Sequence, residues 1–210
     1  MLPIEISIAL EAADADGIAQ SQSRSTAGAV TLNGSLVTSG VAYLQSGSVA
    51  RSVQFTFAQD ATGKSYTVYG TVFEHGDVVF ESVSGTSVSA QTTNYFLTVT
   101  EVLQDAGGGL TIGTNGVGST KWLPVDWLRD PFSGGFGCVV TGTVNYTMQH
   151  TFDDIFDGSV IPVPFDHTDI AGETANQQGN YQFAPRALRV EINSGTGTVR
   201  LVAIQSWDAG

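Results

Sequence analysis

The sequence predicts an all-β protein, an antiparallel β-sandwich or jelly-roll-like fold built as two small β domains with extended arms. Apolar residues alternate at period two along much of the 210-residue chain. Turn residues interrupt that alternation about every 8–12 residues, as in sandwiches and barrels. Charged residues make up 13% of the chain, about half the usual share, and hydroxyl and amide side chains replace them. A polar surface of this kind suits hydrogen-bonded strands.

In the first half, strands are predicted over 53–57, 65–73, 78–80 and 95–103. A hairpin is predicted over 29–38, because Asn33-Gly34 lies at its centre. Asn-Gly is the strongest short hairpin signal, since both central residues of a type I′ turn need positive φ. No helical pattern is convincing beyond short pieces, of which 12–20 is the best.

In the second half, the strand over 143–152 has the clearest alternation. One face carries Val144, Tyr146, Met148, His150 and Phe152. We expect His150 to be a hydrogen-bonded core residue, because its neighbours on that face are apolar. Two further alternating segments, 188–192 and 199–204, are separated by a turn, which predicts a C-terminal hairpin.

The predicted domains are an N-terminal arm over 1–28, a first β domain over 29–112 and a second over 113–210. The triple glycine Gly107–Gly109 lies close to this boundary and is the most flexible interior point. Within the second domain a long loop is expected over 157–185. Loops of that length are usually functional or form a partner-binding arm. One continuous sandwich with a long insertion is the alternative.

The charge balance excludes several partners. The chain has 20 acidic and 8 basic residues, a net charge of −12, and the basic residues are scattered. Nucleic acid is therefore not expected as a partner, because phosphate contacts need clustered Lys and Arg. The simplest interpretation of this negative charge is that it keeps the protein soluble. The alternative interpretation is that the chain docks onto a basic surface of a partner. No apolar run reaches the roughly 18 residues of a membrane span, and Met1–Ile6 does not resemble a signal peptide. We expect synthesis in the cytoplasm and no membrane partner.

No residue is predicted to be catalytic, and we expect no enzyme. The segment Gly113–Gly118 lacks the Lys-Ser/Thr of a phosphate-binding loop. No nucleophile motif and no zinc-ligand spacing is present. Cys138 is the single cysteine and lies in an apolar run, so a buried structural thiol is expected.

The densest acidic segment is a candidate calcium-binding site. Asp153, Asp154 and Asp157, followed by Gly158, are the candidate calcium ligands, because Ca²⁺ takes six to eight oxygen atoms. Their spacing does not match an EF-hand loop, and strand-end and turn roles for the same residues are the simpler alternative. A glycosidase acid/base pair within 153–169 is a further alternative. No other cofactor is predicted.

Interface residues are predicted among the aromatic side chains. Trp122 and Trp127 flank Pro124 in the segment that joins the two halves, which favours packing between domains or subunits. Phe132 and Phe165 are assigned to the interface with them. Stacking of the tryptophans on sugar rings is the alternative.

Several segments together resemble small structural proteins of tailed-bacteriophage virions. They are Gly113–Asp126, Pro131-Phe132, Gly142–Phe156 with its long strand, and Ala184–Arg189. The first half is similar to the threonine-rich β domains that often precede such a module. The resemblance covers roughly the last half of the chain and carries no catalytic or binding residues.

The resemblance implies a non-enzymatic virion component present in many copies and assembled in the host cytoplasm. A capsid decoration or cement protein that clasps neighbouring subunits is expected first, and a tail or neck component is the alternative. The implied partners are further copies of the chain, possible trimers included, and the major capsid protein or other virion proteins. A carbohydrate-binding or host-adhesion module is the rival from another class.

Overall fold

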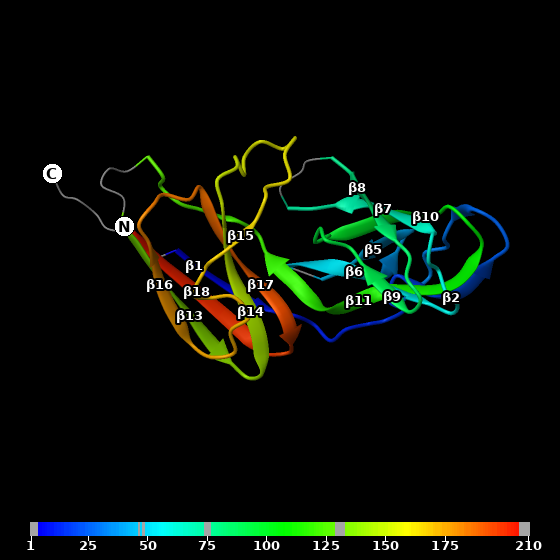
Figure 1. The fold of residues 1–210 in the computed structure, drawn as a ribbon, viewed down its shortest axis with the longest axis horizontal. Helices are drawn as coiled ribbons and strands as arrows, with labels where there is room; N and C mark the ends of the chain where they lie inside the picture. The colour runs from blue at the N-terminus through cyan, green and yellow to red at the C-terminus, as the bar shows by residue number, and fades with distance from the viewer. Residues whose placement is uncertain (1–3, 46, 48, 74–76, 129–132, 206–210) are drawn as a thin grey trace. The chain divides into compact units, whose positions relative to one another are not determined.

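The computed structural model describes residues 4–45, 47, 49–73, 77–128 and 133–205, and every regular element in these ranges is a β-strand. The predicted all-β fold class is therefore confirmed (Figure 1). The chain divides into two compact units. Met1–Glu11 and Gly116–Gly210 form what we call the terminal unit, and Ala12–Asn115 form the inserted unit.

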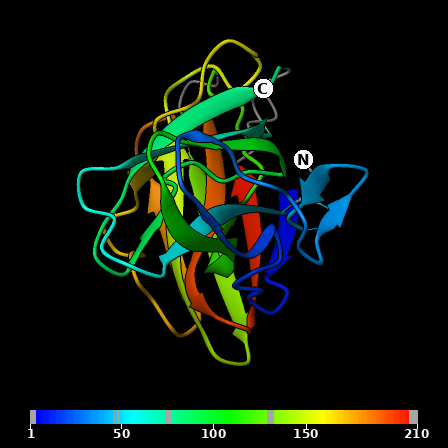
Figure 2. The ribbon, with the colours of Figure 1, turned by 90° about the vertical axis from the view of Figure 1, so that its right-hand side faces the viewer.

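The terminal unit is a sandwich of two antiparallel sheets. One sheet has the order β1-β18-β13-β16, and Figures 1 and 2 show β18, in red, beside the blue β1. The other contains β15-β14-β17, with the end of β11 and with β12 also paired to β17. The strands are β1 (Ile4–Ala9), β11 (Gly108–Thr120), β12 (Leu123–Pro124), β13 (Gly134–Thr141), β14 (Val144–Thr151), β15 (Phe165–Asp166), β16 (Gln177–Tyr181), β17 (Ala187–Gly195) and β18 (Thr198–Gln205).

Two tight connections in the terminal unit link the sheets. β13 is followed by β14, and β17 by β18, yet β13 pairs with β18 and β14 pairs with β17. The predicted C-terminal hairpin is therefore wrong, because its two strands belong to different sheets. The connections are held together by the amides of Thr196 and Gly197, which both donate to the carbonyl of Thr143. Gly195, with φ of 99°, makes the turn possible.

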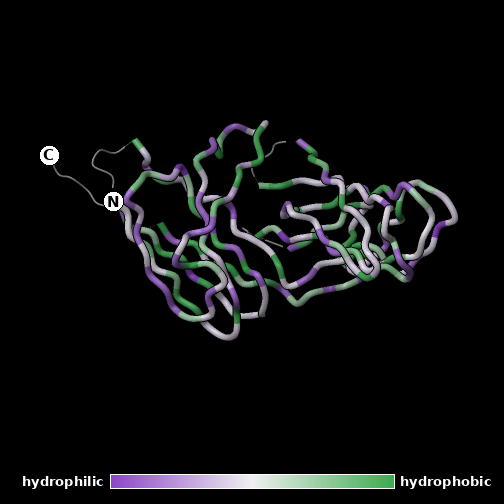
Figure 3. Tube along the Cα trace, in the orientation of Figure 1, coloured by the Kyte–Doolittle hydropathy of each residue, from purple (hydrophilic) through white to green (hydrophobic). Residues whose placement is uncertain are grey.

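The core of the terminal unit lies between its sheets. Along β18, Val199, Leu201 and Ala203 are buried, and hydrophobic and hydrophilic residues alternate along many strands (Figure 3). Strand β14 is buried on both faces, since Thr147, Gln149 and Thr151 are buried along with the apolar set. The sequence predicted a half-buried strand there. On its polar face, Thr147 accepts hydrogen bonds from the Gly172 amide and the Asn193 side chain, and Gln149 accepts one from Arg189.

The inserted unit contains two further groups of strands. One sheet has the order β4-β5-β10-β7-β8, with β3 also paired to β10, while β6 lies between β9 and β11, and β2 pairs with β11. The strands are β2 (Ala19–Arg24), β3 (Gly28–Ala29), β4 (Val37–Thr38), β5 (Val41–Tyr43), β6 (Val49–Phe57), β7 (Ser65–Thr71), β8 (Val79–Ser84), β9 (Ser89–Gln91) and β10 (Thr98–Gln104). Its core includes the packed rings of Phe55, Phe57 and Tyr66.

The predicted hairpin around Asn33-Gly34 is wrong. The amides of Asn33 and Gly34 both donate to the carbonyl of Ile18, and the Asn33 side chain accepts a bond from the Gln20 amide. A Cβ at Gly34 would lie 2.1 Å from the Gly17 carbonyl oxygen. Asn33-Gly34 therefore packs closely against the backbone of Gly17 and Ile18 and does not form a two-residue turn.

The structure divides the chain differently from the sequence-based domains. Residues 1–28, predicted as an arm, contain β1, which pairs with β18, and β2, which pairs with β11. The segment 157–185, predicted as a loop, contains β15 and β16. Strands β2 and β16 are almost entirely polar, so hydrophobic alternation could not reveal them. They are held by backbone hydrogen bonds to neighbouring strands.

Candidate interaction surfaces

Three half-exposed phenylalanines form a cluster in the terminal unit around one buried histidine. Phe152, Phe165 and Phe183 are 49%, 48% and 49% exposed, whereas His150 is 7% exposed. The Phe152 ring centroid lies 5.8 Å from that of Phe165 and 5.7 Å from that of Phe183. The three rings also lie 5.4–5.8 Å from the imidazole of His150. We call these three phenylalanines the aromatic surface.

The histidine below the aromatic surface is fixed by a second strand. His150 Nδ1 and the Tyr181 hydroxyl lie 3.2 Å apart in a buried hydrogen bond that joins β14 to β16. The expectation of a hydrogen-bonded core histidine is confirmed. Burial lowers the pKa of His150, and the nearby His167 lowers it further, whereas Asp166 opposes the shift. The imidazole is therefore an uncharged part of the support for the aromatic rings near neutral pH.

The aromatic surface exposes a large apolar area at one place. At roughly 200 Å² for each phenylalanine, three half-exposed rings present about 300 Å². The largest apolar patch on a typical monomer measures about 300–600 Å² and is often functional, so this surface is a candidate contact site. Aromatic side chains, Phe included, are also enriched at protein interfaces. The arrangement is chemically suited to binding an apolar surface.

The acidic residues near this surface shape the local backbone. Asp153 accepts a hydrogen bond from the Val163 amide, and Asp157 accepts bonds from the amide and hydroxyl of Ser159. Asp154 forms an ion pair of 3.4 Å with Arg186. The three calcium candidates thus have separate turn and ion-pair contacts. Among the described residues, no three His, Cys, Asp or Glu side chains gather in a way that could hold a metal ion.

A polar network holds Asp166 on the face of β15 opposite Phe165. Gln149 Nε2 donates to Asp166 Oδ1 at 2.8 Å and to Glu191 Oε2 at 2.5 Å. Gln149 Oε1 in turn accepts a bond from Arg189 Nε at 2.8 Å. The network fixes an exposed carboxylate on the face of the sheet opposite the rings of His150 and Phe165.

Those predicted interface residues that the structure describes differ in exposure. Trp122 is 4% exposed, with the Arg189 guanidinium 4.4 Å above its ring, so it is part of the interior. Trp127 is 43% exposed, and its ring lies 4.8 Å from the Arg186 guanidinium. Phe165 belongs to the aromatic surface. Phe132 lies outside the described residues.

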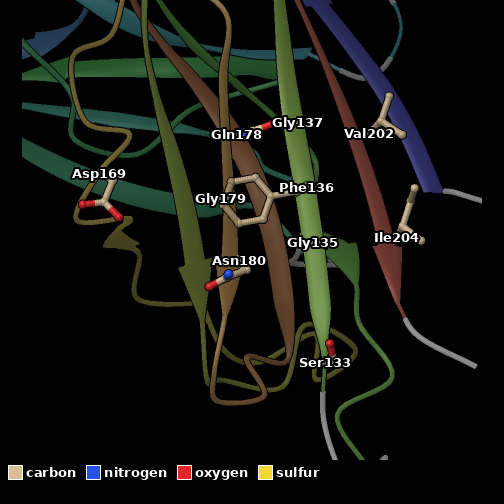
Figure 4. A pocket seen from close by; sticks show the side chains of 10 residues that line it. All are labelled: Ser133, Gly135, Phe136, Gly137, Asp169, Gln178, Gly179, Asn180, Val202 and Ile204. Carbon is tan, nitrogen blue, oxygen red and sulfur yellow. The ribbon is translucent and has the colours of Figure 1, made fainter. Parts of the chain in front are cut away.

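A second feature of the terminal unit is an open cleft of about 810 Å³ on the outer face of the β1-β18-β13-β16 sheet. Its floor is β13 at Gly135 and Gly137 (Figure 4). Figure 4 shows Val202 and Ile204 on one side of this strand and Asp169, Gln178 and Asn180 on the other. The strand register explains the arrangement, because Gly137 is paired with both Gln178 and Val202, and Gly135 with both Asn180 and Ile204. The cleft therefore has one aliphatic wall and one polar wall.

The two floor glycines are not required by the backbone. Neither has a positive φ, and a Cβ at either position would come no closer than 3.9 Å to another atom. Gly179 on β16 differs, because its Cβ would lie 2.7 Å from the Phe136 ring. Glycine within a strand often marks a place where another molecule approaches closely. The cleft is thus a second candidate contact site.

The single cysteine belongs to neither the aromatic surface nor the cleft. Cys138 is buried, and burial raises the pKa of its thiol to about 11, so the thiolate needed for nucleophilic chemistry is scarce at neutral pH. The expectation of a buried thiol is confirmed.

Comparison with protein-family models, with curated proteins and with solved structures gave no match to this chain. Among the described residues there is no helix that could span a bilayer.

Sequence reasoning found Phe165 and His150 but missed Phe183, Tyr181 and the cleft. Phe183 lies in an irregular segment after β16 and belongs to no alternating pattern. The alternation Gly-Phe-Gly-Cys over 135–138 was an available signal for the cleft, since it places glycines on one face and buried residues on the other.

Proposed function

We propose that this chain is a non-enzymatic structural protein of a bacteriophage virion that joins protein neighbours, with capsid decoration as its first placement. The observation that carries the proposal is the aromatic surface, an apolar contact area on a chain with few charges. The virion assignment itself comes from the resemblance of Gly113–Asp126 and Gly142–Phe156 to phage structural proteins. A tail or neck component would use the same surface.

The rigid mounting of the rings supports a role in assembly. Phe152 follows β14, Phe165 is on β15, and His150 and Tyr181 support them from below. Rings held in this way lose little conformational freedom on binding, so more of their burial energy remains for affinity. This suits a protein that must occupy many equivalent positions.

The test is co-sedimentation of the purified chain with empty capsid shells of the phage that encodes it, alongside its mass by light scattering. Saturable binding at a fixed ratio to the major capsid protein is expected. If the chain stays in the supernatant with shells but sediments with purified tails, this result would support the tail placement. Failure to bind either particle would refute the virion proposal.

The cleft favours one second candidate, a carbohydrate-binding module for host adhesion. A pyranose ring has an apolar C–H face and a rim of hydroxyls, which suits a cleft with Val202 and Ile204 on one wall and amides on the other. Among the described residues, the side chains of Gln178 and Asn180 have no hydrogen-bond partner. Neutral oligosaccharides would be titrated against wild-type protein and Gly137→Val, which fills the floor. Saturable binding lost in Gly137→Val would support this function, and no binding would reject it.

A further inference from the structure

We propose that the cleft over β13 selects uncharged saccharides over acidic ones, and that Asp169 is the residue that determines this selectivity. The inference rests on the carbohydrate-binding candidate function of the same cleft, and it names the class of sugar that the cleft would take.

The floor of the cleft repeats one arrangement along β13. Gly135 lies between Asn180 of β16 and Ile204 of β18, and Gly137 is flanked in the same way by an amide and an aliphatic side chain (Figure 4). The two glycines are two positions apart in a strand, so the repeat is about 6.6 Å. Neither glycine is required by the backbone. A ligand built from like rings in a row fits such a repeat in a cleft of about 810 Å³.

The hydrogen-bonding groups that the cleft offers are side chains on one wall. The backbone of β13 forms its hydrogen bonds within the sheet, because this strand pairs with β16 on one side and with β18 on the other. An extended peptide that adds to a sheet needs free backbone groups, and a lipid chain would bury the amides of Gln178 and Asn180 without partners. A sugar ring suits both walls, since its hydroxyls can bond the amides and its C–H face can pack on Val202 and Ile204.

Asp169 gives the polar wall a negative charge. Among the described residues that line the cleft it is the charged one, and Figure 4 shows it on the same side of β13 as Gln178 and Asn180. Its amide donates to His167 Nδ1 at 3.2 Å, and Ile170 next to it is fully buried, so the backbone that carries the carboxylate is held in place. Within the described part of the chain, the Asp169 carboxylate takes part in no hydrogen bond or ion pair.

This carboxylate selects the charge of the ligand. It accepts hydrogen bonds from sugar hydroxyls, whereas it repels the carboxylate of a uronic or sialic acid. In the described strands of this sheet the basic residue is Arg200, and it forms an ion pair with Glu5 at 3.4 Å. An acidic sugar in the cleft therefore meets the charge of Asp169 without an unpaired cation from these strands to offset it.

The test uses the full chain on a glycan array in which each neutral glycan is matched with a counterpart that carries one uronic or sialic acid. The neutral glycan that binds best and its acidic counterpart are then titrated against the ¹⁵N-labelled protein. Neutral binding is expected to shift amide signals in 135–137, 178–180 and 202–204. The acidic counterpart should bind about threefold to tenfold more weakly at low salt, the cost of one like charge at close range. In Asp169→Asn this difference should fall below about twofold.

Glu101→Gln, which removes a charge at an exposed position on β10, is the matched control and should keep the wild-type preference. An unchanged preference in Asp169→Asn, or tighter binding of acidic than of neutral glycans, would overturn the selectivity while leaving carbohydrate binding in place. Absence of shifts in the cleft with every glycan would overturn this inference together with the carbohydrate-binding function. None of these results depends on shell binding, so failure of the virion proposal and failure of this one can be told apart.

Discussion

At the scale of single residues, the aromatic surface is organised around His150. Its imidazole contacts the rings of Phe152, Phe165 and Phe183 and is hydrogen-bonded to Tyr181. The alternating pattern of 143–152 predicted that His150 faces the core. It could not predict Tyr181, 31 residues away, because the intervening segment has no hydrophobic period.

The lowered pKa of His150 predicts a pH dependence of stability. In the unfolded chain this histidine titrates near pH 6.5. Below that pH the unfolded state binds a proton that the folded state does not, so the free energy of unfolding falls as the pH drops from about 6.5 toward the folded pKa. Urea unfolding of wild type and His150→Phe at several pH values measures this contribution. The variant should lose less stability on acidification, and equal pH slopes for the two proteins would contradict the assignment.

Cys138 predicts a large difference between folded and unfolded reactivity. Its thiol is buried and its pKa is raised to about 11, so a thiol reagent should react with the native protein far more slowly than with a free cysteine at pH 8. After unfolding in urea the reaction should be complete within the time expected for an exposed thiol. Rapid labelling of the native protein would show that β13 opens readily or that the thiol is accessible.

At the scale of elements, strand positions were more predictable than strand partners. The expected strands at 53–57, 143–152 and 199–204 correspond to β6, β14 and β18. The turn after β17 was expected to close a hairpin, but it crosses to the other sheet because β18 pairs with β1 and β13. Turn residues indicate that the chain reverses, and the partner of each strand depends on residues far away in sequence.

The cleft gives a paired prediction for two neighbouring strands. Gly137→Ala on β13 should raise the free energy of unfolding by about 0.5–1 kcal/mol, since its φ is not positive and the new Cβ meets no atom within 3.4 Å. Gly179→Ala on β16 should lower it, because its Cβ would lie 2.7 Å from the Phe136 ring. Urea unfolding of both variants measures the contrast. Destabilisation by Gly137→Ala would mean that this glycine is needed by the fold itself.

At the scale of the whole molecule, the all-β class was predictable from the period-two alternation of apolar residues and from the small share of charged residues. The division into units was not, because β1 adds the first residues of the chain to the sheet that holds the last strand. The alternation of Ile4, Ile6 and Ile8 was a short signal for β1, while polar β2 and β16 gave none. The aromatic surface depends on segments brought together by long-range pairing, so sequence spacing placed Phe152 on the face of His150 but could not bring Phe165 and Phe183 to them.

The proposed role of the chain is assembly with other proteins through Phe152, Phe165 and Phe183. Its most direct test is the binding curve of Phe165→Ser on empty shells, compared with wild type and with Phe80→Ser, which removes a phenylalanine that is 65% exposed in the inserted unit. We predict that Phe80→Ser saturates the shells like wild type and that Phe165→Ser needs at least about tenfold more protein, the loss expected for a central interface residue. Equal binding by all three proteins would contradict the account.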